Sequence, residues 1–232
     1  MPSTVKTSAV VLAAGKGLRM ALSHNKVLVQ LEDKPVLAWS LEQFEQNDNI
    51  AEIIIAAAKD DYALCCGIAG NYAKVSHVTE GGESRQQSMA KCLALLNPQI
   101  PWVMIHDAAR PLVSQNDLNA LLAAAALGDN AVLAVPTKNT IKKADAAGYV
   151  CQTLDRSTLW EVQTPQIFAL AHLQAAYANA NKDTLLKATD DAMLVESMGY
   201  PVKIVPGEYR NFKLTTPEDW QMAQIVVKNI KG

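Results

Sequence analysis

Four short runs of consecutive apolar residues, separated by longer amphipathic stretches, constrain the fold of this chain more than any other feature. The runs cover residues 9–12, 53–55, 102–105 and 131–135. Successive side chains of a strand point to opposite faces, so strands that are apolar at every position are typical of a sheet covered on both faces. Their alternation with helical patterns predicts an α/β fold, a Rossmann-like doubly wound sheet that is mostly parallel.

The expected helices have identifiable starts. Residues 33–35 precede the helical pattern of 36–44, Ser84 precedes that of 85–96, and Ser114 with Asp117 has the spacing of a capping box before residues 118–127. Two later helices are expected to begin after Thr189 and Thr216, where acidic residues or a proline occupy the first turn.

The alternation breaks once, between residues 140 and 153. Two short strand-like runs, 141–143 and 149–151, flank a turn segment that ends in Gly148. This pattern is typical of a β-hairpin. With few large apolar residues, the hairpin cannot build a core of its own. We therefore expect one domain over residues 1–232, with a β-arm insertion at 138–157 that projects and clasps a second subunit.

Charge and hydropathy exclude several classes of protein. The chain has 21 basic and 23 acidic residues, a formal net charge of −2. A protein that wraps nucleic acid or lies on an acidic membrane carries a basic excess, so neither partner is expected. The longest apolar run, residues 120–127, is far shorter than the roughly 20 residues of a membrane-spanning helix. The N-terminal residues lack a signal-peptide pattern, which predicts a cytoplasmic protein.

The cysteines indicate no metal or redox site. They occupy positions 65, 66, 92 and 151, and none stands in a C-x-x-C pair. We expect ordinary reduced thiols.

The segment after the first apolar run carries the clearest chemical signal. It reads Leu-Ala-Ala-Gly-Lys-Gly-Leu-Arg-Met over residues 12–20. A glycine-rich loop after a strand lets backbone N–H groups approach phosphates closely. Met20 replaces the third glycine of a dinucleotide-binding fingerprint, and the Walker arrangement is missing too. Arg19 and Lys26 instead place two cations beside the loop, which suits a triphosphate.

This loop and its lysine resemble the signature of the nucleotide-sugar pyrophosphorylase superfamily. Further segments narrow the resemblance: GGESRQQS at 81–88, HDAARP at 106–111, TPQ at 164–166 and NFK at 211–213. Together they resemble the 2-C-methyl-D-erythritol 4-phosphate cytidylyltransferase family over residues 9–225. The resemblance implies a GT-A, nucleotidyltransferase-like fold, Mg²⁺ as cofactor, and cytidylyl transfer from CTP to a polyol phosphate in non-mevalonate isoprenoid biosynthesis.

The resemblance also implies roles for individual residues. Arg19 and Lys26 correspond to transition-state stabilisers, while Arg156 and Lys213 position the polyol phosphate for attack. The implied CTP contacts are Leu12, Ala13, Ala14, Gly15, Gly17, Gly82, Glu83 and Ser88. The implied substrate contacts are Asp107, Arg110, Thr140, Arg156, Thr164 and Lys213, and Asp107 is also the implied magnesium ligand. The resemblance further implies a homodimer, in which residues on the arm of one subunit complete the pocket of the other.

Some residues leave other interpretations open. The chain departs from the family pattern at Asn25 and Val27, which flank Lys26, and at Gln87. Asp107 could simply cap a helix, and His106 is expected to be structural because the reaction needs no general base. A cytidylyltransferase for another polyol phosphate, such as ribitol 5-phosphate, shares the same motifs. A catalytically silent nucleotide-binding regulator is the alternative of a different class.

Overall fold

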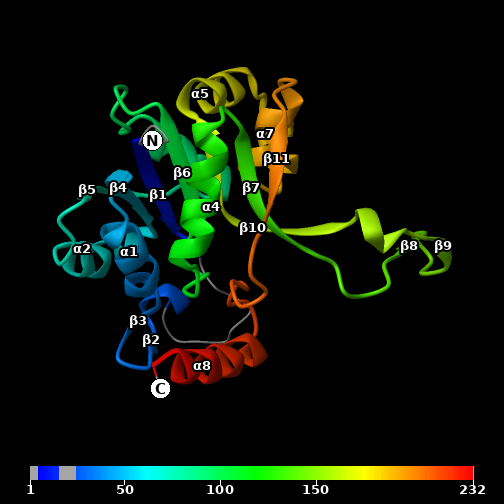
Figure 1. Ribbon diagram of the computed structural model, residues 1–232, viewed down its shortest axis with the longest axis horizontal. Coiled ribbons are helices and arrows are strands. Elements are labelled where there is room, and N and C mark those ends of the chain that lie inside the picture. Colours follow the sequence, from blue (N-terminus) through cyan, green and yellow to red (C-terminus); the bar gives the residue numbers. More distant parts are fainter. Residues whose placement is uncertain (1–4, 16–24, 232) are drawn as a thin grey trace.

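A seven-stranded sheet lies at the centre of the computed structural model, which describes residues 5–15 and 25–231. Its order is β11-β7-β10-β6-β1-β4-β5. The strands are β1 (Thr7–Ala13), β4 (Ile50–Ala57), β5 (Val75–Glu80), β6 (Trp102–Asp107), β7 (Asn130–Pro136), β10 (Trp160–Ala169) and β11 (Val202–Pro206). Among these strands only β10 runs antiparallel to its neighbours. The predicted mostly parallel α/β sheet is confirmed (Figure 1).

Helices cover both faces of the sheet. One face packs against α1 (Val36–Gln46), α2 (Tyr62–Ala69), α4 (Gln115–Ala126) and α8 (Pro217–Lys231), and the other against α3 (Arg85–Leu93), α5 (Leu170–Asn179) and α7 (Asp191–Ser197). In β1, Ala9 and Val11 join the first layer, whereas Val10 and Leu12 join the second. Both layers are hydrophobic, which is why β1 is apolar at every position from Ala9 to Ala13.

Several short elements connect the helices and strands in the described residues. They are the turns of 3-10 helix η2 (Lys26–Leu28), η3 (Lys59–Asp61) and η4 (Arg156–Thr158), the two-residue strands β2 (Gln30–Leu31) and β3 (Lys34–Pro35), and α6 (Lys182–Lys187). No helix in residues 5–15 and 25–231 is long and apolar enough to cross a membrane.

Side-chain caps start the helices where the sequence predicts them. The Ser84 hydroxyl accepts a hydrogen bond from the Gln87 N–H at the start of α3, and Ser114 and Asp117 form a capping box on α4. Helix α3 ends at Leu93, earlier than the predicted Leu96, because the chain turns ahead of Pro98. Helix α4 begins directly after its cap, at Gln115 rather than Leu118.

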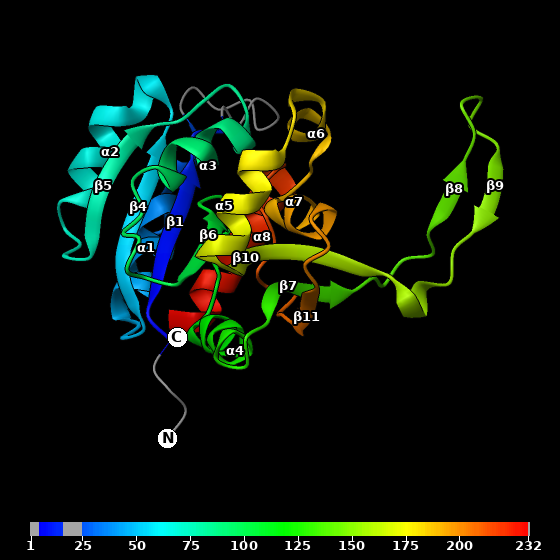
Figure 2. The same cartoon turned by 90° about the horizontal axis from the view of Figure 1, so that it is seen from above.

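A hairpin stands away from the body of the molecule, as Figures 1 and 2 both show. Strands β8 (Lys142–Ala144) and β9 (Val150–Thr153) pair antiparallel, and every residue in them is exposed. The segment leaves the sheet after β7 and returns as β10. Its position and shape match the predicted arm, whose binding to a second subunit stays a prediction.

Candidate active site

The order of strands places a crevice at one edge of the sheet. From β1 the chain adds β4 and then β5 on one side, and β6 then pairs with the other side of β1. Ligands of doubly wound sheets bind at such a switch point, outside the carboxyl ends of the strands. Ala14 and Gly15, which follow β1, and Asp107 at the end of β6 belong to this edge.

Asp107 lies between two cations at this edge. Its Oδ1 is 3.2 Å from Arg85 Nε, and its Oδ2 is 2.6 Å from Lys213 Nζ. Burial alone would raise the pKa of Asp107, but the charges of Arg85 and Lys213 lower that pKa well below its usual range. Asp107 is therefore ionised throughout the physiological pH range and holds the Lys213 ammonium in place.

Arg85 joins Asp107 to a second carboxylate. Its Nη1 is 2.6 Å from Oδ2 of Asp191, whose side chain is completely buried. The Tyr177 hydroxyl donates to the other oxygen of Asp191 at 2.6 Å. Burial and the Asp191 charge raise the pKa of Tyr177, so the hydroxyl keeps its proton. The sequence predicted no site role for Arg85, Asp191 or Tyr177, although Arg85 lies within the motif at 81–88.

A segment near the C-terminus carries Lys213 to Asp107. Arg110 Nη1 donates to the Asn211 carbonyl at 2.8 Å, and the Leu214 N–H donates to the Ala109 carbonyl at 2.8 Å. The side-chain amide of Asn211 donates from Nδ2 to the Thr164 carbonyl at 2.9 Å. These contacts fix residues 211–214 along the loop that follows β6.

Strand β10 contributes Thr164 because it runs opposite to its neighbours. Its early residues lie at the edge where the parallel strands end, and the Asp107 N–H donates to Thr164 Oγ1 at 2.9 Å. Asp107, Arg110, Thr164 and Lys213, all predicted substrate contacts, thus line one pocket of about 210 Å³. The other lining residues are Arg85, Val162, Gln163, Gln166, Thr189 and Asp190.

Six of the predicted nucleotide contacts lie at the end of β1 or just before α3. A Cβ on Gly81 would lie 2.3 Å from the Ala14 Cβ, so only glycine lets these two segments pack together. Leu12, Ala13 and Gly15 belong to the first segment, and the exposed Glu83 belongs to the second. Gly17 and Arg19 lie outside the described residues.

Ser88, a predicted CTP contact, lies within α3. Its side chain is buried, donates to the Ser84 carbonyl at 2.9 Å and accepts from the Gly82 N–H at 3.0 Å. The hydroxyl therefore holds the Gly82 backbone at the start of α3. Its contact with a ribose stays a prediction.

Lys26 reaches across the crevice. It is buried in η2, and its Nζ donates to the Leu214 carbonyl at 2.5 Å, one residue from Lys213. The structure thus brings Lys26 close to the substrate side of the site.

Thr140 and Arg156 do not lie at this site. Both are exposed on the projecting segment, and Arg156 Nη1 donates to the Lys138 carbonyl at 3.1 Å. Neither residue lines the pocket around Asp107. Within one chain, the arm does not bring them to the other predicted contacts.

Comparison with known proteins identifies the family of this chain. The family model for 2-C-methyl-D-erythritol 4-phosphate cytidylyltransferase matches residues 7–229. The chain belongs to this family. A family member from Halalkalibacterium halodurans is 42% identical over 222 residues, covering 95% of this chain and 96% of that protein.

Solved structures show the same fold. The 4-diphosphocytidyl-2C-methyl-D-erythritol synthase of Anaerococcus prevotii superposes with a TM-score of 0.85 at 31% identity, covering 97% of both chains. The family member from Thermus thermophilus gives a TM-score of 0.77 at 32% identity, covering 96% of this chain and 99% of that one.

The ion pairs of Asp107 bear on its predicted role as a magnesium ligand. Both of its oxygens form ion pairs with cations, and Asp191 is likewise engaged by Arg85 and Tyr177. The described residues contain no group of three or more metal-ligating side chains. A carboxylate offers about four lone-pair positions and these ion pairs use two of them, so the role of Asp107 as a magnesium ligand stays a prediction.

His106 is structural, as the sequence predicts. It is completely buried, its Nε2 lies 3.0 Å from the Arg110 carbonyl, and its Nδ1 lies 3.3 Å from Thr164 Oγ1. A neutral ring that donates from Nε2 and accepts at Nδ1 satisfies both partners. Burial lowers the pKa of His106 to about 4.

This lowered pKa predicts how stability depends on pH. Between about pH 6.5 and 4 the unfolded chain binds a proton at His106 that the folded chain excludes, so stability falls as the pH falls, by about 3 kcal/mol in total. Urea unfolding at several pH values measures this loss. The His106→Gln variant should lose that part of the pH dependence, whereas His77→Gln, at an exposed site, should keep it. An unchanged pH dependence in His106→Gln would contradict the assignment.

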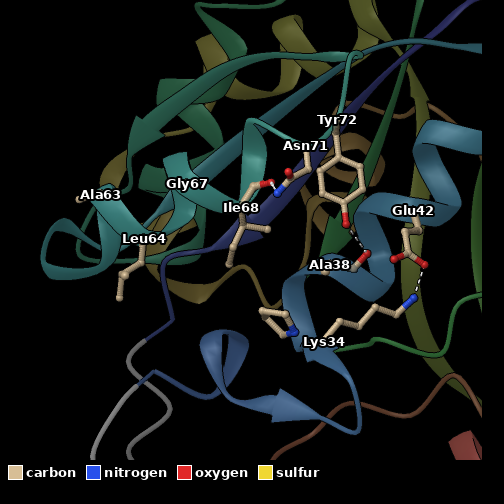
Figure 3. A pocket seen from close by; sticks show the side chains of 10 residues that line it. Lys34, Ala38, Glu42, Ala63, Leu64, Gly67, Ile68, Asn71 and Tyr72 are labelled. Carbon is tan, nitrogen blue, oxygen red and sulfur yellow. Dashed lines mark hydrogen bonds and ion pairs between the residues drawn. The ribbon is translucent and has the colours of Figure 1, made fainter.

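A larger hollow of about 550 Å³ lies between α1 and α2 (Figure 3). Its polar groups pair with one another: Lys34 with Glu42, and the Tyr72 hydroxyl with the Ala38 carbonyl at 3.3 Å. The rest of its wall is mainly aliphatic, including Leu64 and Ile68. Because it presents no excess of positive charge, we place the phosphate chemistry in the smaller pocket.

Proposed function

We propose that this chain transfers the cytidylyl group of CTP to 2-C-methyl-D-erythritol 4-phosphate. A phosphate oxygen of the acceptor attacks the α-phosphorus of CTP, the bond from that phosphorus to the β-phosphate bridging oxygen breaks, and pyrophosphate leaves. The attacking phosphate is already ionised at neutral pH, so the protein needs no general base. Its work is to align two polyanions and offset their repulsion.

One observation carries this proposal: three cationic side chains from different parts of the chain converge on the pocket at the switch point. Arg85, Arg110 and Lys213 line it together with only two carboxylates, Asp107 and Asp190. Membership of the cytidylyltransferase family supports the nucleotide and the acceptor. The acceptor phosphate would bind Lys213 and Arg110, and Thr164 would contact its polyol chain.

The nucleotide would occupy the neighbouring edge. Its phosphates would meet the backbone after β1, and Arg19 and Lys26 would stabilise the charge that accumulates as pyrophosphate departs. The base would lie against Gly82 and Glu83. Asp107 would hold a divalent cation, and that cation would offset the charge of the nucleotide phosphates.

The arm would complete the site of a second subunit. Thr140 and Arg156 are exposed, lie on the projecting segment and do not line their own chain's pocket. A homodimer in which each arm reaches the partner's pocket would bring Arg156 to the acceptor phosphate. This arrangement gives two composite sites per dimer.

Pyrophosphate release by the purified protein tests the proposal. With CTP, Mg²⁺ and methylerythritol phosphate, we expect steady release, and with ribitol 5-phosphate we expect none. Arg19→Ala should reduce release about 100-fold or more, because one transition-state cation is lost. Lys228→Ala, which changes an exposed lysine on α8, should remain fully active.

Other results would select an alternative. Release with ribitol 5-phosphate alone would keep the chemistry and replace the acceptor. Measurable CTP binding with no release from either acceptor would favour the silent regulator.

A further inference from the structure

We propose that Asn25 is a positioning residue for Lys26, and that it acts through both ends of its carboxamide. This inference rests on the proposed role of Lys26 in cytidylyl transfer. Asn25 directly precedes η2 and is 8% exposed. It is therefore a buried polar group whose hydrogen bonds determine where it stands.

The carboxamide contacts three different parts of the chain. Its Oδ1 accepts from the Val27 N–H at 3.4 Å. Its Nδ2 donates to the Ala13 carbonyl at 3.2 Å and to Asp61 Oδ2 at 2.8 Å. Ala13 ends β1 and Asp61 ends η3, so one side chain ties the turn of Lys26 to two elements beside the crevice.

These anchors bear directly on the position of the Lys26 ammonium. The Asn25 carbonyl accepts from the Leu28 N–H at 2.9 Å, which closes the turn that carries Lys26. At its far end, the Lys26 side chain donates to the Leu214 carbonyl. Hydrogen bonds thus fix the backbone of Lys26 relative to β1. Another hydrogen bond fixes its Nζ relative to the segment that carries Lys213. A shift of the turn would move the ammonium relative to both substrates.

A simple helix cap would not need the side-chain nitrogen of Asn25. A cap uses only the acceptor oxygen, which aspartate also supplies. The contacts with Ala13 and Asp61 need an N–H₂ donor, which aspartate lacks, and a carboxylate at position 25 would face the Asp61 carboxylate. Asn25→Asp therefore keeps the cap and removes the two anchors.

The test combines kinetics with chemical labelling of Lys26. For Asn25→Asp we expect kcat to fall about tenfold or more with the KM for CTP changed by less than about threefold, because a misplaced group costs rate. The acetylation rate of Lys26 by an amine-reactive ester, mapped by peptide mass spectrometry relative to Lys228, should rise at least about threefold as the anchored turn loosens. Adding Asp61→Asn to Asn25→Asp restores a donor between the two positions and should recover part of both effects.

Matched variants keep the proposal falsifiable. Asn181→Asp changes another capping asparagine, on α6, and should alter neither measurement. Asp61→Ala removes a single anchor at a partly exposed site and should give smaller changes in the same directions if Asn25→Asp does not fold. The proposal would be overturned if Asn25→Asp kept the kcat and the Lys26 labelling rate of the wild type. It would also be overturned if kcat fell while the Lys26 labelling rate stayed unchanged. Labelling needs no turnover, so an inactive wild-type protein would refute the proposed function and still leave this inference tested.

Discussion

Replacement of Arg85 by methionine is expected to lower the free energy of unfolding by about 3–5 kcal/mol, because it leaves buried charges without a partner. Arg85 pairs with Asp191, whose side chain is completely buried, and with Asp107, whose side chain is 11% exposed. Methionine fills a similar volume but carries no charge. Tyr177 would still donate to Asp191, and Lys213 would still pair with Asp107, so each carboxylate would lose only part of its compensation.

Urea unfolding monitored by circular dichroism measures this change. Lys203→Met is the control, because it breaks an exposed ion pair with Asp129 and should cost less than about 1 kcal/mol. Arg85→Lys keeps the charge but cannot span both carboxylates, so its stability should lie between those of wild type and Arg85→Met. Equal unfolding midpoints for Arg85→Met and Lys203→Met would show that the network does not stabilise the fold.

Replacement of Lys213 by methionine is expected to lower kcat/KM for methylerythritol phosphate about 10²–10³-fold, because a preorganised cation is lost from the acceptor phosphate. The fold should survive, since the Lys213 side chain is 38% exposed and Arg85 still pairs with Asp107. Steady-state pyrophosphate release measures the effect, and Lys203→Met is again the control. Activity within about threefold of wild type would remove Lys213 from the proposed mechanism.

Lys213→Met also tests whether each active site is formed by residues of two subunits. Arg156→Met should be similarly inactive, although Arg156 does not line the pocket of its own chain. If arms are exchanged, a mixed dimer of the two variants holds one site with both residues intact. Random mixing should then restore about a quarter of wild-type activity. No recovery, in a mixture shown to contain mixed dimers, would place Arg156 and Lys213 in the same site on one chain.

The sequence by itself determined the layered fold, and it predicts which residues bear the chemistry. The apolar runs 9–12, 53–55, 102–105 and 131–135 predict strands buried on both faces, and all of them are strands of the sheet. The caps at Ser84 and Ser114 are equally local signals, because a hydroxyl and an N–H three residues apart need no distant partner. Asp107 could be predicted at the carboxyl edge because it ends an apolar strand.

Only the tertiary structure decided which of these residues meet. Arg85 and Asp191 are more than a hundred positions apart, and no local pattern distinguishes an arginine that bridges two carboxylates from one on a solvated helix start. Strand β10 brings Thr164 beside Asp107 because it runs antiparallel, a direction that its own residues do not encode. Ion pairs and hydrogen bonds between such distant residues depend on the packing of the whole sheet, whereas periodicity and caps depend on neighbours along the chain.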